Sequence, residues 1–178
     1  MHNELIAKFV LSYCIGSLPF SVFLSKLLLN QDIRTIGSGN IGTSNAYRAG
    51  GFTFSLLVAF FDVSKSIFVI KYILPGNIGL LAVCLGQMYP LFLKFKGGKG
   101  MGCYLGGIFA INSWLGLLFI SIWLALVKIS KSPFISSMVI ILASVLLMKL
   151  DFPLLIIWAL IVLRHKSNMQ DLLNNNRE

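Results

Sequence analysis

Long apolar runs, separated by short polar connections, occupy most of this sequence of 178 residues. The first two runs, residues 5–29 and 52–74, are each as long as the roughly 20 apolar residues that an α-helix needs to cross a bilayer. Hydrophobic residues make up 57% of the chain and charged residues only 12%, whereas soluble domains are about 25% charged. We therefore expect an integral membrane protein rather than a soluble one.

Seven such runs are expected to form seven membrane-spanning helices, which makes the predicted fold class all-α. Turn-forming residues separate the runs, for example Pro75-Gly76-Asn77 after the second. The fourth run is short for a full crossing, and merging it with the fifth would give six helices. The first run is longer than a signal-peptide core, so we expect a retained helix in a single domain spanning residues 1–178. The seven expected helices are residues 5–29, 52–74, 78–95, 101–111, 114–129, 134–148 and 152–163.

The net charge of +9 would suggest a nucleic-acid partner if the protein were soluble. Here the lysines and arginines lie between apolar runs, so we expect them to set the membrane orientation and expect no nucleic-acid partner. With seven crossings most of them fall on one side, which the positive-inside rule predicts to be cytoplasmic, together with the C-terminus. Six crossings would spoil this asymmetry. The cations on the predicted cytoplasmic side are Arg34, Arg48, Lys94, Lys96, Lys99, Lys128, Lys131, Arg164, Lys166 and Arg177.

The first connection contains GSGNIGTSNAYR, residues 37–48, which is rich in hydrogen-bond donors and has no acidic residue. Its glycines allow backbone N–H groups to surround an anion at close range. Ser38, Asn40 and Asn45 add neutral donors, and the planar guanidinium of Arg48 matches a phosphate group. A flexible loop with helix caps is the alternative, but these donors exceed what one cap needs. We interpret the segment as an oxyanion site.

The third connection contains KFKGGKG, residues 94–100, and leads into a helix that we expect to begin near Gly100. Glycines before a helix N-terminus are typical of anion-binding sites. The spacing of a nucleotide-binding loop, GxxxxGKS or GxxxxGKT, is missing, so we do not expect nucleotide binding. Lys94 is interpreted as an interfacial anchor. The candidate ligands of this segment are Lys96, Gly97, Gly98, Lys99 and Gly100.

A third polar segment, RHKSN at residues 164–168, follows the last apolar run. Cations at the C-terminus of a helix offset its dipole, which explains the segment without any ligand. His165 and Asn168, however, lie three residues apart on one helical face, so both can reach one ligand. With all three segments on the cytoplasmic side, the sequence predicts a site for a small, multiply charged anion such as phosphate. The apolar helices below it would suit a lipid chain.

These segments, in this order, resemble the bacterial acyl-phosphate:glycerol-3-phosphate acyltransferase family. The resemblance covers nearly the whole chain and implies a seven-helix protein of the bacterial inner membrane, with its active site facing the cytoplasm. It implies transfer of a fatty acyl group from acyl phosphate to the 1-hydroxyl of glycerol 3-phosphate, among membrane lipids, which gives lysophosphatidic acid and phosphate. The matching stretches are GSLPF (16–20), DIRTIGSGNIGTSNAYR (32–48), the pair Asp62 and Lys65, PLFLKFKGGKG (90–100) and RHKSN (164–168).

The resemblance also implies roles for individual residues, and neither a metal nor a coenzyme is expected. The glycine loop, with Gly97, Gly98 and Gly100, is implied to face the acyl-phosphate donor. The sequence departs from the family pattern at Gln87, where a histidine is usual, and at Asp171, where an arginine is usual. We expect residue 87 to serve packing or hydrogen bonding rather than chemistry. The residues implied to hold glycerol 3-phosphate and to act in catalysis are Ser38, Arg48, Lys99, His165 and Asn168.

Acyl phosphate is already activated, so the implied reaction needs no acyl-enzyme, and the sequence has no GxSxG or HxxxxD motif. Asp62 is the best candidate for a base, but we interpret it as a structural partner of Lys65 three residues later. A transporter for phosphate or organophosphate is the main alternative, and it would need charged or broken helices near the membrane midplane. A protein that binds lipid headgroups without chemistry is the second alternative.

Overall fold

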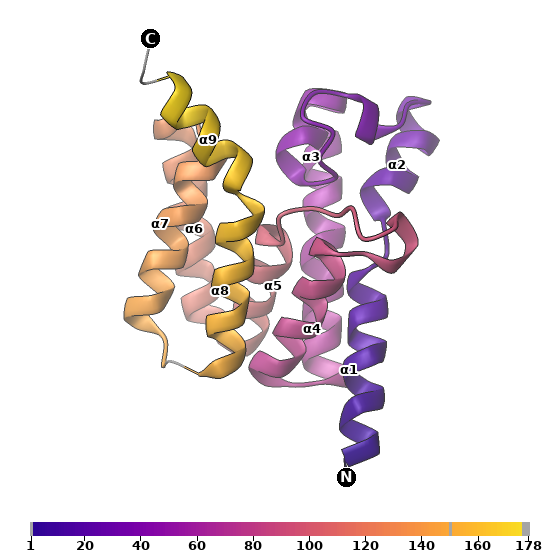
Figure 1. Ribbon diagram of the computed structural model, residues 1–178, viewed down its shortest axis with the longest axis vertical. Coiled ribbons are helices and arrows are strands. Elements are labelled where there is room, and N and C mark those ends of the chain that lie inside the picture. Colours follow the sequence, from indigo (N-terminus) through magenta and orange to yellow (C-terminus); the bar gives the residue numbers. More distant parts are fainter. Residues whose placement is uncertain (1, 150, 176–178) are drawn as a thin grey trace.

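The computed structural model describes residues 2–149 and 151–175, and within them all regular structure is helical (Figure 1). The predicted all-α fold class is therefore confirmed. Three short elements of other helix types are η1 (Ile33–Thr35), η3 (Leu91–Leu93) and the π-helical η2 (Val69–Ile73). The α-helices are α1 (His2–Gly16), α2 (Phe20–Leu29), α3 (Thr43–Phe68), α4 (Gly76–Met88), α5 (Met101–Ile111), α6 (Ser113–Ser130), α7 (Pro133–Leu147), α8 (Phe152–Arg164) and α9 (Lys166–Asn175).

The described residues contain seven apolar helical stretches in the order expected from the sequence. Four of them are long and apolar enough to cross a membrane: His2–Leu29, Thr43–Ile73, Gly76–Leu93 and Ser113–Ser130. The shorter ones are Met101–Ile111, Pro133–Leu147 and Phe152–Arg164. The chain is thus a helical membrane protein, while the number of crossings and their orientation stay predictions. Arg177, one of the cations used to predict that orientation, lies outside the described residues.

The prediction of one continuous helix over residues 5–29 is wrong. α1 ends at Gly16 and α2 begins at Phe20, with Pro19 directly before it. Proline has no N–H group, so it cannot continue the hydrogen bonds of a helix that precedes it, but it is tolerated at a helix start. The break allows the two halves of this apolar run to pack against different helices, since α1 packs against α4 and α2 packs against α3.

The next two expected helices are displaced from their predicted bounds. α3 starts at Thr43 rather than at residue 52, and Gly50 and Gly51 interrupt it with non-helical dihedral angles. Gly51 has a φ of 73°, a backbone conformation that glycine adopts without strain. A short helical segment, residues 43–49, therefore precedes the kink and belongs to the polar connection. α4 ends at Met88, well before residue 95, because the residue that precedes Pro90 is disfavoured in a helix.

Glycines allow α1 and α4 to pack at very short range. A Cβ atom added to Gly86 would lie 2.3 Å from the carbonyl oxygen of Tyr13, and one added to Gly16 would lie 2.4 Å from that of Val83. Side-chain atoms do not approach backbone oxygens this closely, so any larger residue would separate the helices. Close contacts through small residues are typical of helices packed within a bilayer.

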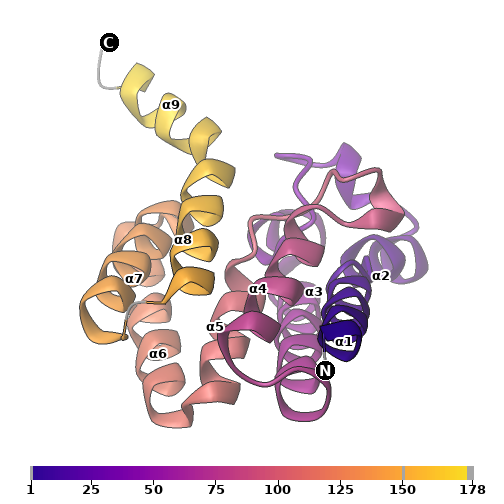
Figure 2. The ribbon, with the colours of Figure 1, turned by 60° about the horizontal axis from the view of Figure 1, so that its bottom comes forward.

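α5 lies between the group α1–α4 and the group α6–α8, as Figure 2 shows. Its side chains Cys103, Tyr104 and Ile108 are fully buried, so α5 forms the centre of the bundle. The outside carries large apolar side chains instead, and Trp114 is 85% exposed and Leu146 75% exposed. Surfaces of this kind are rare on soluble proteins and are expected where lipid is the solvent.

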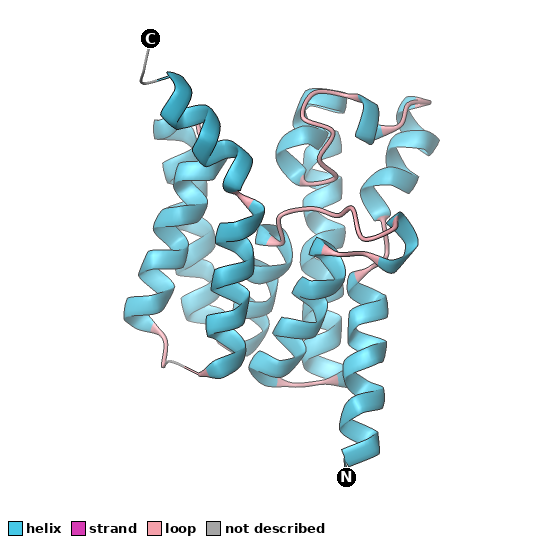
Figure 3. Cartoon of the chain, in the orientation of Figure 1, coloured by secondary structure: helices cyan, strands magenta, loops and turns pink. Residues whose placement is uncertain are grey.

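Two long polar connections lie in the half of the molecule toward α9, away from the N-terminus of α1 (Figure 3). One joins α2 to α3 and the other joins α4 to α5, and they contain the first two polar segments predicted from the sequence. The third segment lies at the junction of α8 and α9, in the same half. The fold thus gathers all three at one end of an apolar bundle.

We expect Gly86→Ala to destabilise the protein by about 1–3 kcal/mol, because the added methyl group collides with the backbone of α1. The midpoint of thermal unfolding in detergent measures this loss. Ala125→Val is the matched control, since it adds methyl groups on the exposed face of α6. Equal midpoints for Gly86→Ala and the wild type would contradict the close approach of the two helices.

Candidate anion-binding site

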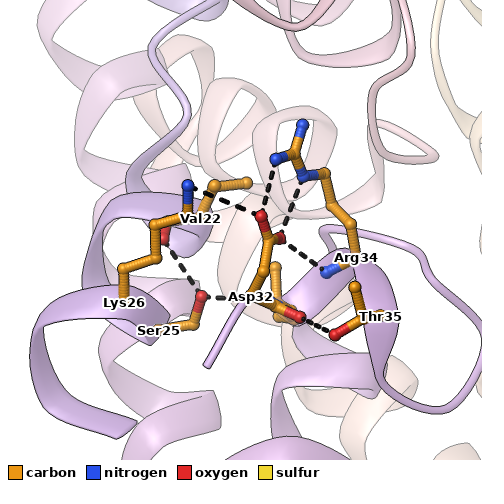
Figure 4. A network of polar contacts seen from close by, with 7 residues as sticks. Val22, Ser25, Lys26, Asp32, Arg34 and Thr35 are labelled. Carbon is orange, nitrogen blue, oxygen red and sulfur yellow. Dashed lines mark hydrogen bonds and ion pairs between the residues drawn. The ribbon is translucent and has the colours of Figure 1, made fainter. Parts of the chain in front are cut away.

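Asp32 orders the start of the connection between α2 and α3. Its carboxylate accepts a hydrogen bond from the backbone N–H of Arg34 at 3.0 Å and pairs with the Arg34 guanidinium at 2.6 Å (Figure 4). The Arg34 side chain holds the pKa of Asp32 well below its usual range. Ser25 in α2 accepts the N–H of Ile33 at 3.1 Å, so η1 is fixed to the end of α2.

Asn45 is the centre of this connection, and its position corrects the sequence prediction. Its side chain donates to the carbonyls of Ile33 at 3.0 Å and Ile36 at 2.9 Å, and accepts the N–H of Ser38 at 3.0 Å. The residue is only 1% exposed. Both donors of its amide are therefore used within the loop, so Asn45 shapes the connection instead of offering donors to a ligand.

Ser38 and Arg48 lie close together on the exposed side of the same connection. A Cβ atom added to Gly37, the neighbour of Ser38, would lie 3.1 Å from Cδ of Arg48. Asn40 forms a local turn, in which its side-chain oxygen accepts the N–H of Gly42 at 3.1 Å. Ser38 and Arg48 are thus both exposed and accessible to a ligand, as are Ser44 and Tyr47 of the same segment.

The glycine loop between α4 and α5 packs directly against this first connection. The N–H of Gly98 donates to the carbonyl of Gln87 at 2.9 Å, and a Cβ added to Gly98 would lie 3.6 Å from Ile41 and 3.7 Å from Asn40. Gly100 is the N-cap of α5, as expected, with a φ of 81°. Glycine is needed at 97 for packing, since a Cβ there would lie 2.3 Å from the carbonyl oxygen of Gln87, and at 100 for packing and backbone conformation.

The third segment reaches the glycine loop through two side chains. Lys99 donates a hydrogen bond to the side-chain oxygen of Asn168, which is partly buried. Arg164 donates to the carbonyl of Gly98 at 3.1 Å and also to that of Gly97, and its guanidinium lies 5.4 Å from the centre of the Tyr89 ring. From the sequence, Arg164 is expected only to set the membrane orientation and to offset the helix dipole, so this contact is not predicted. The place of Arg164 directly before His165 was the one signal of this role.

Charge couples the members of this group. Burial lowers the pKa of Lys99, and the nearby charges of Arg164 and Arg48 lower it further, against an opposing effect of Asp171. Burial also lowers the pKa of His165, whose Nδ1 lies 2.8 Å from the carbonyl of Ile161, and Lys99 and Arg164 add to that decrease. These groups form a cationic cluster, defined here as Arg48, Lys99 and Arg164, with His165 and Asn168 beside it.

An anion is the natural ligand of the cationic cluster, because like charges held together in a partly desolvated place favour a negative partner. The structure brings four of the five predicted catalytic residues into it or beside it, and places Ser38 near Arg48. Lys96 lies outside this cluster, on the exposed side of the glycine loop, and its role stays a prediction.

The predicted pairing of Asp62 with Lys65 is confirmed, and it lies inside the bundle away from solvent. Lys65 Nζ is 3.1 Å from Asp62 Oδ1, and both residues are at least nine-tenths buried. Gln87 bridges them, since its Nε2 donates to Asp62 Oδ2 at 3.1 Å and its Oε1 accepts from Lys65. The hydrogen-bonding role expected for residue 87 is therefore present, and Asp62 is fully paired.

The fold and the cationic cluster define a helical membrane protein whose glycine loop and cations lie together at one end of the bundle. Comparison with known proteins defines the class further, because a family model described as glycerol-3-phosphate acyltransferase matches residues 6–175. The chain belongs to this family of acyltransferases of phospholipid synthesis, as the resemblance in its motifs predicted.

Individual relatives agree over almost the full length. A glycerol-3-phosphate acyltransferase of Thermosipho melanesiensis is 38% identical over 186 residues, which covers 97% of this chain and 91% of that protein. The crystal structure of PlsY (YgiH), an integral membrane glycerol 3-phosphate acyltransferase, in its glycerol 3-phosphate form is 30% identical with a TM-score of 0.83. Its lysophosphatidic acid form is 29% identical with a TM-score of 0.78, and each alignment covers 96% of this chain and 92% of the other.

We expect Asn45→Ala to release the connection between α2 and α3. It leaves two carbonyls and the N–H of Ser38 without their partner, at a cost of about 1–3 kcal/mol. Hydrogen exchange of the Ser38 amide should become faster and the thermal midpoint should fall. Asn3→Ala, at an exposed position of α1, is the control and should change neither measurement. Unchanged exchange at Ser38 would show that Asn45 does not order the loop.

Stability should decrease as the pH falls below about 6.5, in part because of His165. Its pKa in the folded protein is lower than the ordinary value of 6.5, so the unfolded chain binds the proton more tightly. Protonation of His165 therefore favours unfolding at pH values between its lowered pKa in the folded protein and its ordinary pKa. The stability that neutral His165 contributes is fully present above the ordinary pKa. Thermal midpoints from pH 8 to pH 5 should fall less steeply for His165→Gln than for the wild type. His2→Gln is the control, and a wild-type slope in His165→Gln would count against this assignment.

Proposed function

We propose that this protein transfers a fatty acyl group from acyl phosphate to the 1-hydroxyl of glycerol 3-phosphate, and releases lysophosphatidic acid and inorganic phosphate. Membership of the family supports glycerol 3-phosphate as the acceptor. The similar structures, solved in a glycerol 3-phosphate form and a lysophosphatidic acid form, support it too. The observation that carries the proposal is the cationic cluster beside the glycine loop, at one end of an apolar bundle. Such a site suits two phosphorylated substrates, one of which has a lipid chain.

The cationic cluster provides the acceptor site in this proposal. Lys99 and Arg48 bind the phosphate of glycerol 3-phosphate, with Ser38, His165 and Asn168 as hydrogen-bonding partners. Burial and the charges of Arg164 and Arg48 lower the pKa of Lys99, and a dianionic phosphate in this place opposes that decrease, so its binding strengthens the proton affinity of the lysine. The hydrogen bond from Lys99 to Asn168 holds the ammonium group before the substrate arrives.

The glycine loop provides the donor site in this proposal. The N–H of Lys99 and the start of α5 face a phosphate that carries two or more negative oxygens, while the N–H of Gly98 stays bound to the carbonyl of Gln87. Gly97 and Gly98 are buried, and Gly98 lies beside the first connection, so a donor bound here lies next to the acceptor. The acyl chain extends toward the apolar surface of the bundle.

The transfer then depends on how the two substrates are positioned and on the cations around them, and it needs no covalent intermediate with the enzyme. The 1-hydroxyl oxygen attacks the carbonyl carbon of the donor, the bond from that carbon to the phosphate oxygen breaks, and the hydroxyl proton goes to the departing phosphate. Holding two mutually repelling anions within reach of each other lowers the activation free energy of the transfer by several kcal/mol, with an upper range of about 7–11 kcal/mol for ideal geometry. Cations stabilise the charge that develops on the carbonyl oxygen and the leaving group. Asp62 has no part as a base, because Lys65 and Gln87 occupy its oxygens.

The membrane arrangement in this proposal is a single domain over residues 1–178 with seven crossings in a bacterial inner membrane. The C-terminus and the cationic cluster face the cytoplasm, where both phosphorylated substrates are soluble or reach the inner leaflet. The opposite positions of the N-terminus of α1 and the end of α9 support an odd number of crossings (Figure 1). The three short apolar helices α5, α7 and α8 then span with local thinning of the bilayer.

The purified protein should convert labelled glycerol 3-phosphate into a lipid that is extractable into organic solvent, with acyl phosphate as donor. Acyl-CoA and acyl carrier protein are tested in parallel and should give no product. Lys99→Ala and Arg48→Ala should each lower kcat/KM by about 10²–10³, because each removes a cation from the reacting charges. Lys128→Ala, at the end of α6, is the matched control and should retain activity.

Three outcomes would contradict the proposal. Full activity in both Lys99→Ala and Arg48→Ala would show that the active site is elsewhere. If acyl-CoA served as well as acyl phosphate, the proposed donor would be wrong. Uptake of label into sealed vesicles without a lipid product would favour a transporter instead.

A further inference from the structure

The glycine loop is held from two opposite sides. From α8, Arg164 donates hydrogen bonds to the carbonyls of Gly97 and Gly98. From α4, the carbonyl of Gln87 accepts the N–H of Gly98 at 2.9 Å, and a Cβ added to Gly97 would lie 2.3 Å from the same oxygen. Because the peptide bond is trans, binding of these two carbonyls by Arg164 turns the N–H of Lys99 away from the guanidinium. The loop thus has one defined conformation without any ligand.

Gln87 is itself anchored to an ion pair inside the bundle. Its Nε2 donates to Asp62 at 3.1 Å, its Oε1 accepts from Lys65, and Lys65 lies 3.1 Å from Asp62. These three residues are 4–6% exposed. Their side-chain polar groups bind one another, so a lost partner leaves a buried charge or amide unpaired.

The ion pair also contacts the start of α5, the helix that follows the glycine loop. A Cβ added to Gly102 would lie 3.2 Å from Cβ of Asp62, and Cys103 Sγ donates to the carbonyl of Asp62 at 3.4 Å. The pair therefore touches both ends of the loop, through Gln87 at its beginning and through the first turn of α5 at its end. Buried charges in a spanning helix are costly, and this pair has no contact with the cationic cluster that would explain it.

We propose that Gln87 is a positioning residue for acyl transfer, which transmits the fixed position of the Asp62–Lys65 pair to Gly97 and Gly98 and so holds the donor-binding loop in its ligand-ready form. This inference rests on the proposed function for its kinetic consequence. Gln87 touches neither substrate, and it acts through the backbone that does.

Replacement of Gln87 by leucine keeps the backbone carbonyl but removes the bridge to the ion pair. Gln87→Leu should lower kcat about 10- to 100-fold and raise the KM for acyl phosphate, while the KM for glycerol 3-phosphate changes less than about threefold. Gln87→His should restore activity to within about threefold, because an imidazole can donate to Asp62 and accept from Lys65. Gln87→Asn, whose amide is too short to bridge, gives the same test if the leucine variant does not fold. Gln31→Leu, at an exposed amide, is the matched control.

A second readout separates positioning from activity. Hydrogen exchange of residues 94–101 in detergent should become at least tenfold faster in Gln87→Leu, remain slow in Gln87→His, and stay unchanged elsewhere in the protein. Wild-type kinetics and exchange in Gln87→Leu would overturn the inference. So would a loss that affects both KM values equally and speeds exchange throughout the protein, because that is a merely structural effect. If the wild type transfers no acyl group, the proposed function fails, and the exchange result still decides whether Gln87 holds the loop.

Discussion

Two carbonyl groups of the glycine loop bind the guanidinium of Arg164, and the cationic cluster is assembled around that junction. The contact joins segments that are 66 and 67 residues apart in the chain. It is charge-assisted and partly buried, and such hydrogen bonds contribute about 1.5–3 kcal/mol each. This contribution helps to offset the repulsion that arises when Arg164, Lys99 and Arg48 are brought into mutual range. The cluster is therefore held in a state that an arriving anion stabilises.

The rest of the bundle serves to keep that junction in place. α5 begins at the glycine loop and is buried among the other helices, so the loop cannot move without disturbing the core. Glycines allow α1 to lie against α4, and α4 carries Gln87 to the other side of the loop. Helices within a bilayer have no hydrophobic driving force for association. The close backbone contacts between α1 and α4 and the buried bridge of Gln87 with Asp62 and Lys65 therefore make the bundle rigid.

Much of this arrangement was predictable from the sequence, because it depends on composition and local order. The order of the apolar runs and the start of α5 near Gly100 follow from short-range patterns. The inward orientation of Asn45 does not, since an asparagine amide has the same donors whether it meets a ligand or a backbone carbonyl. Arg164 likewise looks like any interfacial cation until the fold brings Gly97 and Gly98 to it. The number of crossings stays a prediction, because no membrane defines it here.

The kink in α3 determines how the first connection tolerates change. A Cβ atom at Gly51 would meet nothing within 4 Å, although the φ of this residue is 73°. Crowding therefore places no limit on a side chain here, and the torsional preference of the backbone alone selects glycine. A residue that disfavours this torsion would move residues 43–49, which carry both Arg48 and the buried Ala46. The backbone conformation at position 51 thus controls the direction of the Arg48 side chain without contacting that arginine.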